Sequence, residues 1–195
     1  MSEVELPNPE ELEEAKAHTF TRRVALTTAI FAVLLAITSL GGNNAMKEML
    51  LAQQQASDQW AFYQAKAMRE HLYRGQKMRL ELDLLEKDSL KPEVKKRYQA
   101  LLQKTIEEEA RYGAEKKEIE KEARHLEHER DVNRDKDPYF DYAEVLLQIA
   151  IVMSSIAILA HSRLMFGFSL VSATLGALLS ANGFLMIVRL PFFGH

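Results

Sequence analysis

Apolar residues gather in three long runs, and one long charged stretch separates the first run from the other two. Only His161, Ser162 and Arg163 stand between the second run and the third. Because about 20 apolar residues in a helix cross a typical hydrocarbon core, the pattern predicts three transmembrane helices. We assign them to residues 21–42, 138–160 and 164–190.

The charged stretch, residues 43–137, consists mostly of good helix formers such as Ala, Leu, Glu, Lys, Arg and Gln. Pro92 interrupts it, because proline lacks an N–H and clashes with the preceding turn of a helix. We therefore expect two arms, at about 44–87 and 92–135, joined by a turn at 88–91. Arms of nearly equal length predict an antiparallel helical hairpin that leaves the membrane and returns to it.

Apolar residues along both arms recur in steps of three and four, as in an antiparallel coiled coil. The positions expected in this seam are Met49, Ala52, Ala56, Trp60, Tyr63, Ala67, Met78, Leu82 and Leu85, then Val94, Tyr98, Leu101, Thr105, Tyr112, Ile119, Ala123 and Leu126. Glu70, Arg74 and Lys116 interrupt the seam, so the hairpin is expected to need partner chains to bury it fully. The expected fold class is an all-α membrane protein with three transmembrane helices and a coiled-coil-like hairpin between the first and the second.

Local signals set the expected helix ends. The acidic segment 1–20 is a tail or short helix that starts at Asn8 and Pro9. The run 41–44, Gly-Gly-Asn-Asn, is expected to end the first transmembrane helix, and Asp137-Pro138 to begin the second. The alternative that the first apolar run is a cleaved signal peptide is disfavoured, because the run starts late and lacks a clear cleavage site.

Charge beside the spans bears on orientation. Arg22 and Arg23 precede the first span and favour a cytoplasmic N-terminus, which places the hairpin in the periplasm. Basic residues also lie on the opposite side, so sidedness stays open. Residues 44–137 hold equal numbers of acidic and basic residues, which disfavours nucleic-acid binding. The chain has no cysteine, so it forms no disulfide and has no thiolate chemistry.

Few residues carry candidate chemistry. Glu122 and His125 are three apart on a predicted helix, with His128 nearby, as in one half of a di-iron site. Such a site needs a second pair and two further glutamates, so a solvated face is favoured and no metal, cofactor or catalytic residue is expected. No ionisable group lies deep in any span, which disfavours a water-filled pore.

Two sets of residues are candidates for interactions. Trp60, Phe62 and Tyr63 form either a docking patch or part of the packing between the arms, which is favoured. In the third span, small residues spaced four apart allow helix backbones to approach closely in lipid, within one protomer or between protomers. These small residues are Ser172, Gly176 and Ser180.

Three blocks of sequence carry a family resemblance: residues 22–26, Arg-Arg-Val-Ala-Leu; residues 39–44, Ser-Leu-Gly-Gly-Asn-Asn; and residues 59–66, Gln-Trp-Ala-Phe-Tyr-Gln-Ala-Lys. They resemble a bacterial multi-pass membrane-protein family catalogued only as a domain of unknown function. The resemblance covers most of the chain and implies a location in the bacterial inner membrane. It implies no activity, cofactor or catalytic residue.

The favoured hypothesis is a non-enzymatic structural or interaction protein that assembles, as a homo-oligomer, through its spans and its hairpin in the lipid bilayer. One alternative is an accessory subunit of a larger respiratory or photosynthetic membrane complex. The other is a homo-oligomeric channel or transport component. Foreign subunits that co-purify in mild detergent would favour the accessory subunit, and a uniform homo-oligomer would favour the other two.

Overall fold

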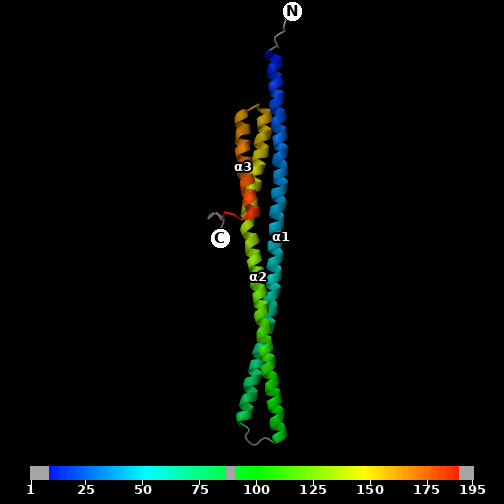
Figure 1. Cartoon of the computed structure of the whole chain (residues 1–195), viewed down its shortest axis with the longest axis vertical. Coiled ribbons are helices and arrows are strands. Elements are labelled where there is room, and N and C mark those ends of the chain that lie inside the picture. Colours follow the sequence, from blue (N-terminus) through cyan, green and yellow to red (C-terminus); the bar gives the residue numbers. More distant parts are fainter. Residues whose placement is uncertain (1–8, 87–90, 189–195) are drawn as a thin grey trace, which may run out of the picture. The chain divides into compact units, whose positions relative to one another are not determined.

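The computed structural model describes residues 9–86 and 91–188, and side chains from residue 17 onward. Three helices make up this part of the chain, α1 (Pro9–Glu86), α2 (Pro92–Leu159) and α3 (Arg163–Leu185), and it contains no strand (Figure 1). Each helix includes a stretch long and apolar enough to cross a membrane. The contacts divide the chain into unit 1, Met1–Glu48 with Val132–His195, and unit 2, Met49–Asp131.

Two expected helix boundaries are wrong. α1 continues through Gly41–Asn44, where the sequence predicted an end, and it also joins the expected N-terminal helix to the first apolar run. α2 continues through Pro138, where the sequence predicted a start. A helix tolerates an interior glycine at a cost of about 1 kcal/mol and an interior proline at about 3 kcal/mol, so side-chain packing near these residues must offset both costs.

Other boundaries lie where the sequence placed them. α1 begins at Pro9 and α2 at Pro92, each with proline in the first turn. The Lys91 carbonyl accepts hydrogen bonds from Val94 N at 3.0 Å and Lys95 N at 3.1 Å, which caps the start of α2. Most of the expected turn between the arms, with Lys87 at the end of the first arm, falls outside the described residues.

α2 and α3 are joined by the short turn that the sequence predicted. The Ser162 hydroxyl accepts a hydrogen bond from Met165 N and caps α3. α3 ends at Leu185, earlier than expected, because Met186 adopts a left-handed conformation with φ of 49°. The Asn182 amide then exchanges two hydrogen bonds with Val188, at 2.8 and 2.9 Å. The last two residues of the expected span, 189 and 190, lie outside the described residues.

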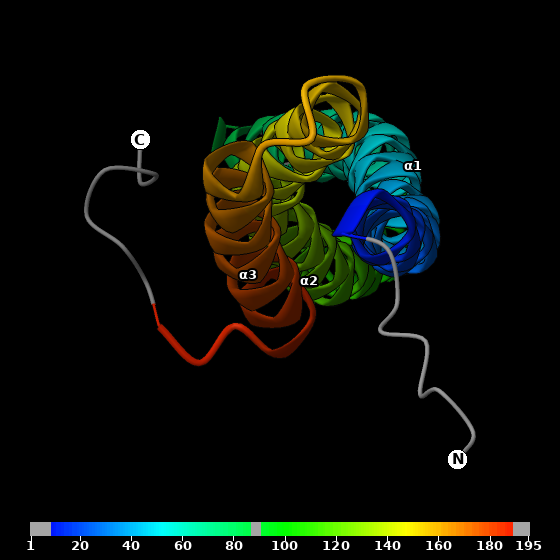
Figure 2. The same cartoon turned by 90° about the horizontal axis from the view of Figure 1, so that it is seen from above.

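Small residues fill the contacts among the three helices of unit 1, which run side by side in Figures 1 and 2. The buried residues of α3 are Ser169, Ala173, Gly176, Ser180 and Gly183. The buried residues of α2 include Ala143, Leu147, Ala150, Ser154 and Ala157, and those of α1 include Val24, Phe31, Thr38 and Ala45. These positions are three, four or seven apart. Most of them carry small side chains, which let the backbones approach closely; Val24, Phe31 and Leu147 are the larger members of the set.

Phe140 of α2 explains why glycines stand inside α1. Its side chain is only 2% exposed. A Cβ added at Gly41 would lie 2.7 Å from the Phe140 ring and 2.6 Å from the Phe184 ring, and one added at Gly183 would lie 3.0 Å from Phe140. The two rings meet edge to face, with centroids 4.9 Å apart. Phe140 therefore occupies the space that side chains at Gly41, Gly42 and Gly183 would need.

Replacing Gly41 with alanine tests this packing. Gly41→Ala gains helix propensity but drives a methyl group into two rings, so we expect the variant to be less stable by about 1–3 kcal/mol. Gly75, also inside α1, has no atom within 4 Å of an added Cβ. Gly75→Ala should therefore be more stable by about 0.5–1 kcal/mol. Thermal unfolding of both variants in detergent, followed by circular dichroism, checks this; equal stability of the two would contradict the packing argument.

Candidate interaction sites

In unit 2, α1 and α2 run antiparallel: residues further along α1 pair with residues earlier in α2. The hydrogen-bonded and ion-paired side chains are Gln53 with Arg130, Trp60 with Glu127, Lys66 with Glu115 and Arg74 with Glu109. Along α1 the buried residues Ala52, Ala56 and Glu70 face α2, and half-buried Tyr63 lies at the same spacing. Polar side chains thus join the two helices along most of the contact.

The expected seam departs from this contact toward the end of α1. Met78, Leu82 and Leu85 were placed in the seam, but they are 58%, 58% and 76% exposed. Lys77 and Leu84 follow Glu70 by seven and fourteen residues, so they lie on the same face of α1 and point toward α2. Both are half-buried. The sequence pattern did not predict these two positions, because only apolar residues were counted and the charged residues at the contact were treated as interruptions.

The candidate patch of Trp60, Phe62 and Tyr63 is split by the structure. Trp60 Nε1 donates a hydrogen bond to Glu127 Oε1 at 2.9 Å, and the Trp60 and Tyr63 rings meet edge to face at 5.3 Å. Both residues therefore lie at the contact between α1 and α2. Phe62 is 59% exposed.

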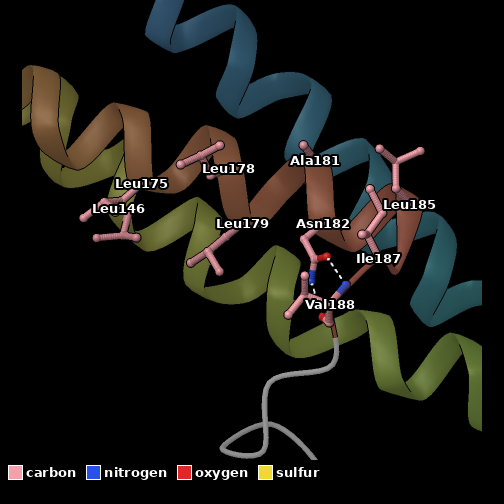
Figure 3. Close-up of a pocket in the computed structure, with 9 residues that line it drawn as sticks. All are labelled: Leu146, Leu175, Leu178, Leu179, Ala181, Asn182, Leu185, Ile187 and Val188. Atoms are coloured by element: carbon pink, nitrogen blue, oxygen red, sulfur yellow. Dashed lines mark hydrogen bonds between the residues drawn. The ribbon is translucent and has the colours of Figure 1, made fainter.

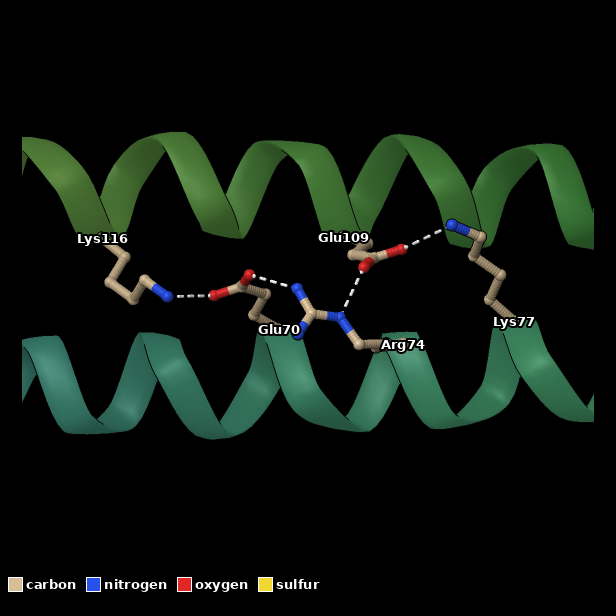
Figure 4. A network of polar contacts seen from close by, with 5 residues as sticks. All are labelled: Glu70, Arg74, Lys77, Glu109 and Lys116. Carbon is tan, nitrogen blue, oxygen red and sulfur yellow. Dashed lines mark hydrogen bonds and ion pairs between the residues drawn. The ribbon is translucent and has the colours of Figure 1, made fainter.

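Glu70, Arg74 and Lys116 interrupted the predicted seam, and Glu70 pairs with both Arg74 and Lys116 (Figure 4). Glu70 accepts from Lys116 Nζ at 2.5 Å and from Arg74 at 2.9 Å. Arg74 also bonds Glu109 at 2.9 Å, and Lys77 Nζ lies 3.2 Å from the same carboxylate. A sequence pattern scores each polar residue alone, so it could not show that the interruptions on the two arms compensate one another.

The network keeps its members charged. The hydrogen bond from Lys116 holds the pKa of Glu70 below its ordinary value, although burial opposes this. The same bond raises the pKa of Lys116. The hydrogen bond from Arg74 lowers the pKa of Glu109, and that from Lys66 lowers the pKa of Glu115. Near neutral pH these residues therefore link the helices through charge-assisted hydrogen bonds, which are stronger than neutral ones.

Tyr112 is a contact residue that the sequence marked only as part of the seam. Its ring stacks on Tyr73 with centroids 5.6 Å apart. Lys66, Arg69 and Arg111 place their cationic groups 4.9–5.7 Å from the Tyr112 ring centre. Cations at this distance from an aromatic face are attracted to it, so Tyr112 adds a second kind of contact between the arms.

The small residues of α3 contact helices of the same chain. Ser172 Oγ donates to the Leu146 carbonyl at 2.7 Å. A Cβ at Gly176 would lie 3.1 Å from the Ala143 carbonyl oxygen. The Ser180 and Thr38 hydroxyls are hydrogen-bonded at 2.8 Å. The sequence did not predict the contact of Thr38 with α3. A threonine in an apolar run can satisfy its hydroxyl on its own helix, as Thr38 does by donating to the Leu34 carbonyl, so its presence does not indicate a partner on another helix.

The candidate metal residues are not brought together as a site. Glu122, His125 and His128 are all exposed, and His125 Nε2 lies 3.4 Å from Glu129 of the same helix. Within residues 9–86 and 91–188, no three His, Asp or Glu side chains are close enough together to hold a metal ion.

An apolar groove of about 520 Å³ lies on α2, α3 and the residues after α3 (Figure 3). Its lining is leucine, isoleucine, valine and alanine, with Asn182 as its one amide. The Asn182 amide is engaged with the Val188 backbone, so it holds the end of α3 in place. This lining offers hydrocarbon contact and no group suited to acid–base or nucleophilic chemistry.

These features define an all-helical protein with helices able to span a membrane, whose polar and small residues hold helices together. The chain belongs to the family described as a domain of unknown function, DUF4337, whose model matches residues 20–186. The resemblance to an uncharacterised family is thereby confirmed. Neither a curated protein nor a solved structure matches the chain.

The lowered pKa of Glu70 predicts a pH dependence of stability. A carboxyl whose pKa is lower in the folded state stabilises the protein fully above its unfolded pKa, about 4.3, and loses that contribution as pH falls toward the folded value. The melting temperature of the full chain should therefore fall between pH 5 and pH 3.

Two variants isolate the contribution of Glu70. In Glu70→Gln the melting temperature should depend less on pH over this range. Glu118→Gln should keep the original dependence, because Glu118 is 73% exposed and pairs with Lys121 of its own helix. If Glu70→Gln behaved like Glu118→Gln, the ion-pair network would not set the stability of unit 2.

Proposed function

We propose that the chain is a non-enzymatic, multi-pass protein of the bacterial inner membrane that works by binding other protein chains. Three transmembrane helices would anchor an antiparallel, coiled-coil-like hairpin formed by unit 2. The observation that carries this proposal is the contrast between the two units. Unit 1 is apolar on its outside and has small residues inside, whereas charged side chains cover much of the outside of unit 2.

The outside of unit 1 favours lipid as its surroundings. Its exposed apolar residues include Leu26, Ile30, Val33, Ile37 and Leu40 on α1, Val145, Ile149, Val152 and Ile156 on α2, and Leu164, Phe168, Val171, Leu175 and Leu178 on α3. A continuous apolar exterior is unfavourable in water at about 25 cal/mol per Å². Lipid removes that cost, and it also favours the small-residue contacts observed among the helices.

The spacing in unit 2 supports a coiled-coil-like hairpin. On α2, the buried residues Thr105, Tyr112, Ala123 and Leu126 are seven, eleven and three residues apart. These separations are sums of three- and four-residue steps, as the apolar positions of a heptad require. The ion pairs of Glu70 with Lys116 and of Glu109 with Arg74 link the two helices and thus act as structural groups. A rigid helical pair outside a membrane is suited to binding a protein surface, because helix faces present side chains at fixed spacing.

Orientation can be tested because the chain has no cysteine. Ser57 of unit 2 and His161 of the α2–α3 turn are both exposed. With the N-terminus in the cytoplasm, a membrane-impermeant maleimide should label Ser57→Cys in intact spheroplasts and His161→Cys only after permeabilisation. The opposite labelling pattern would place the hairpin in the cytoplasm, and equal labelling would contradict the three-span arrangement.

Assembly is tested by native mass spectrometry of the full chain, extracted in mild detergent. We expect extraction to require detergent and to yield one homo-oligomeric species. Stoichiometric foreign proteins would favour an accessory subunit of a larger complex. A monomer without bound protein would contradict the proposal that the chain works by assembly.

A further inference from the structure

An exposed apolar strip follows α1 in unit 2, and we call it the α1 outer strip. It consists of Ala61, Ala65, Met68, Leu72, Gly75, Met78 and Leu82. These residues are three or four apart, so they share one face of the helix. Met68 is 75% exposed and Leu72 is 59% exposed. The strip lies in the charged segment that we propose to stand outside the membrane, so lipid does not cover it as it would cover the apolar exterior of unit 1.

The strip faces away from the contact between α1 and α2. Tyr63 and Glu70 face α2, and Ala61 and Met68 each stand two residues before one of them. At 100° per residue, two residues turn about 200° around the helix. The strip is therefore on the outer edge of the helix pair, where a third helix could pack.

A matching face lies on the opposite edge, on α2, and we call it the α2 outer face. It consists of Glu107, Ala110, Ala114, Lys117, Lys121 and Arg124, all exposed. Glu107, Ala110 and Ala114 stand two residues before Glu109, Tyr112 and Lys116, which contact α1. Lys121 stands two residues before the buried Ala123. The α1 outer strip and the α2 outer face thus lie on the two opposite edges of one helix pair.

We propose that the α1 outer strip binds the α2 outer face of a second copy of this chain. This inference rests on the proposed function, that copies assemble while anchored in one membrane. Copies anchored in this way are related by an axis along the membrane normal and keep the same height. The α2 of a neighbouring copy would then pair with α1 in the register seen within the chain, where Arg74 pairs with Glu109 and Glu70 pairs with Lys116.

That register makes the two faces complementary. It places the large Leu72 opposite the small Ala110 and Ala114. It also places Asp58, beside one end of the strip, near Arg124 of the neighbouring copy, and Arg79 near Glu107. Between Asp58 and Ala65 the surface of α1 has a hollow of about 380 Å³ beside Phe62, which suits the aliphatic stems of Lys121 and Arg124.

Charge disfavours the simplest alternative, in which two α1 strips pack on each other. Two copies in one membrane would have parallel α1 helices, so Asp58 would face Asp58 and Arg79 would face Arg79. Like charges across an interface oppose association. Contact between two different faces is heterologous, and repeated copies then close into a ring or extend as a row.

Disulfide formation between two single-cysteine chains tests the contact. Chains with different tags, one Leu72→Cys and one Ala114→Cys, are co-expressed and oxidised in membranes. We expect a mixed disulfide at least tenfold more abundant than with His71→Cys and Ala114→Cys. His71 is exposed but points about 100° away from Leu72. A yield equal to this control, or a dominant disulfide between two Leu72→Cys chains, would overturn the proposal.

Charge reversal provides an independent readout on the same cross-link. Arg79→Glu alone and Glu107→Arg alone, each introduced into both tagged chains, should lower the mixed disulfide several-fold. Both reversals in every chain should restore it, because each contact then regains an opposite-charge pair. Failure of the double variant to recover, while the chain still assembles, would contradict the proposed register.

The size of the detergent-extracted protein separates the two levels of the hypothesis. A homo-oligomer without the Leu72–Ala114 cross-link would refute this contact and leave the proposed function intact. A monomer without bound protein would refute both. A co-purifying foreign protein that shields Leu72→Cys from maleimide would show that another protein covers the strip and would overturn the proposal of a second copy.

Discussion

The side chain of Phe140 fills the space that side chains at Gly41, Gly42 and Gly183 would occupy, with its ring against Gly41 and Gly183 and its Cβ against Gly42. It brings α1, α2 and α3 together at one level and leaves little room for a side chain at three positions where glycine stands inside a helix, although glycine is otherwise unfavourable there. Because Tyr139 and Phe140 directly follow Pro138 and are both almost fully buried, the same packing accounts for the continuation of α2 through a proline.

The two units differ in the side chains that join their helices. In unit 1 the helices meet through small residues, a few hydroxyl contacts such as Thr38 with Ser180, and the buried side chains of Phe31, Phe140 and Leu147, while most other large apolar residues face outward. In unit 2 the helices meet through buried alanines such as Ala52, Ala56 and Ala123, through aromatic rings and through charged pairs centred on Glu70. Ion pairs between the helices contribute to stability only while both partners stay charged, and because each joins one residue of α1 to one of α2 they favour a single register. The register set by Glu70 and Lys116 also decides which residues form the outer edges of unit 2.

Sequence reasoning located features that depend on local chemistry. The start of α2 at Pro92 and the short turn at Ser162 follow from backbone rules that act over a few residues. The sequence did not predict that α1 continues through Gly42 and α2 through Pro138. Local backbone rules do not include the packing of an aromatic ring from another helix. The seam near Met78 was placed wrongly for a related reason: a pattern of apolar residues carries no information about charges that pair across helices.

Hydrogen exchange at the backbone amides of Gly42, Asn43 and Asn44 tests the central claim most directly. If Phe140 holds α1 in an unbroken helix, these amides keep their helical hydrogen bonds and should exchange slowly in lipid nanodiscs, at rates like those of the apolar run before them. In a Phe140→Ala chain they should exchange much faster. Rapid exchange of the three amides in the unmodified chain would show that the helix ends there, and it would contradict this account.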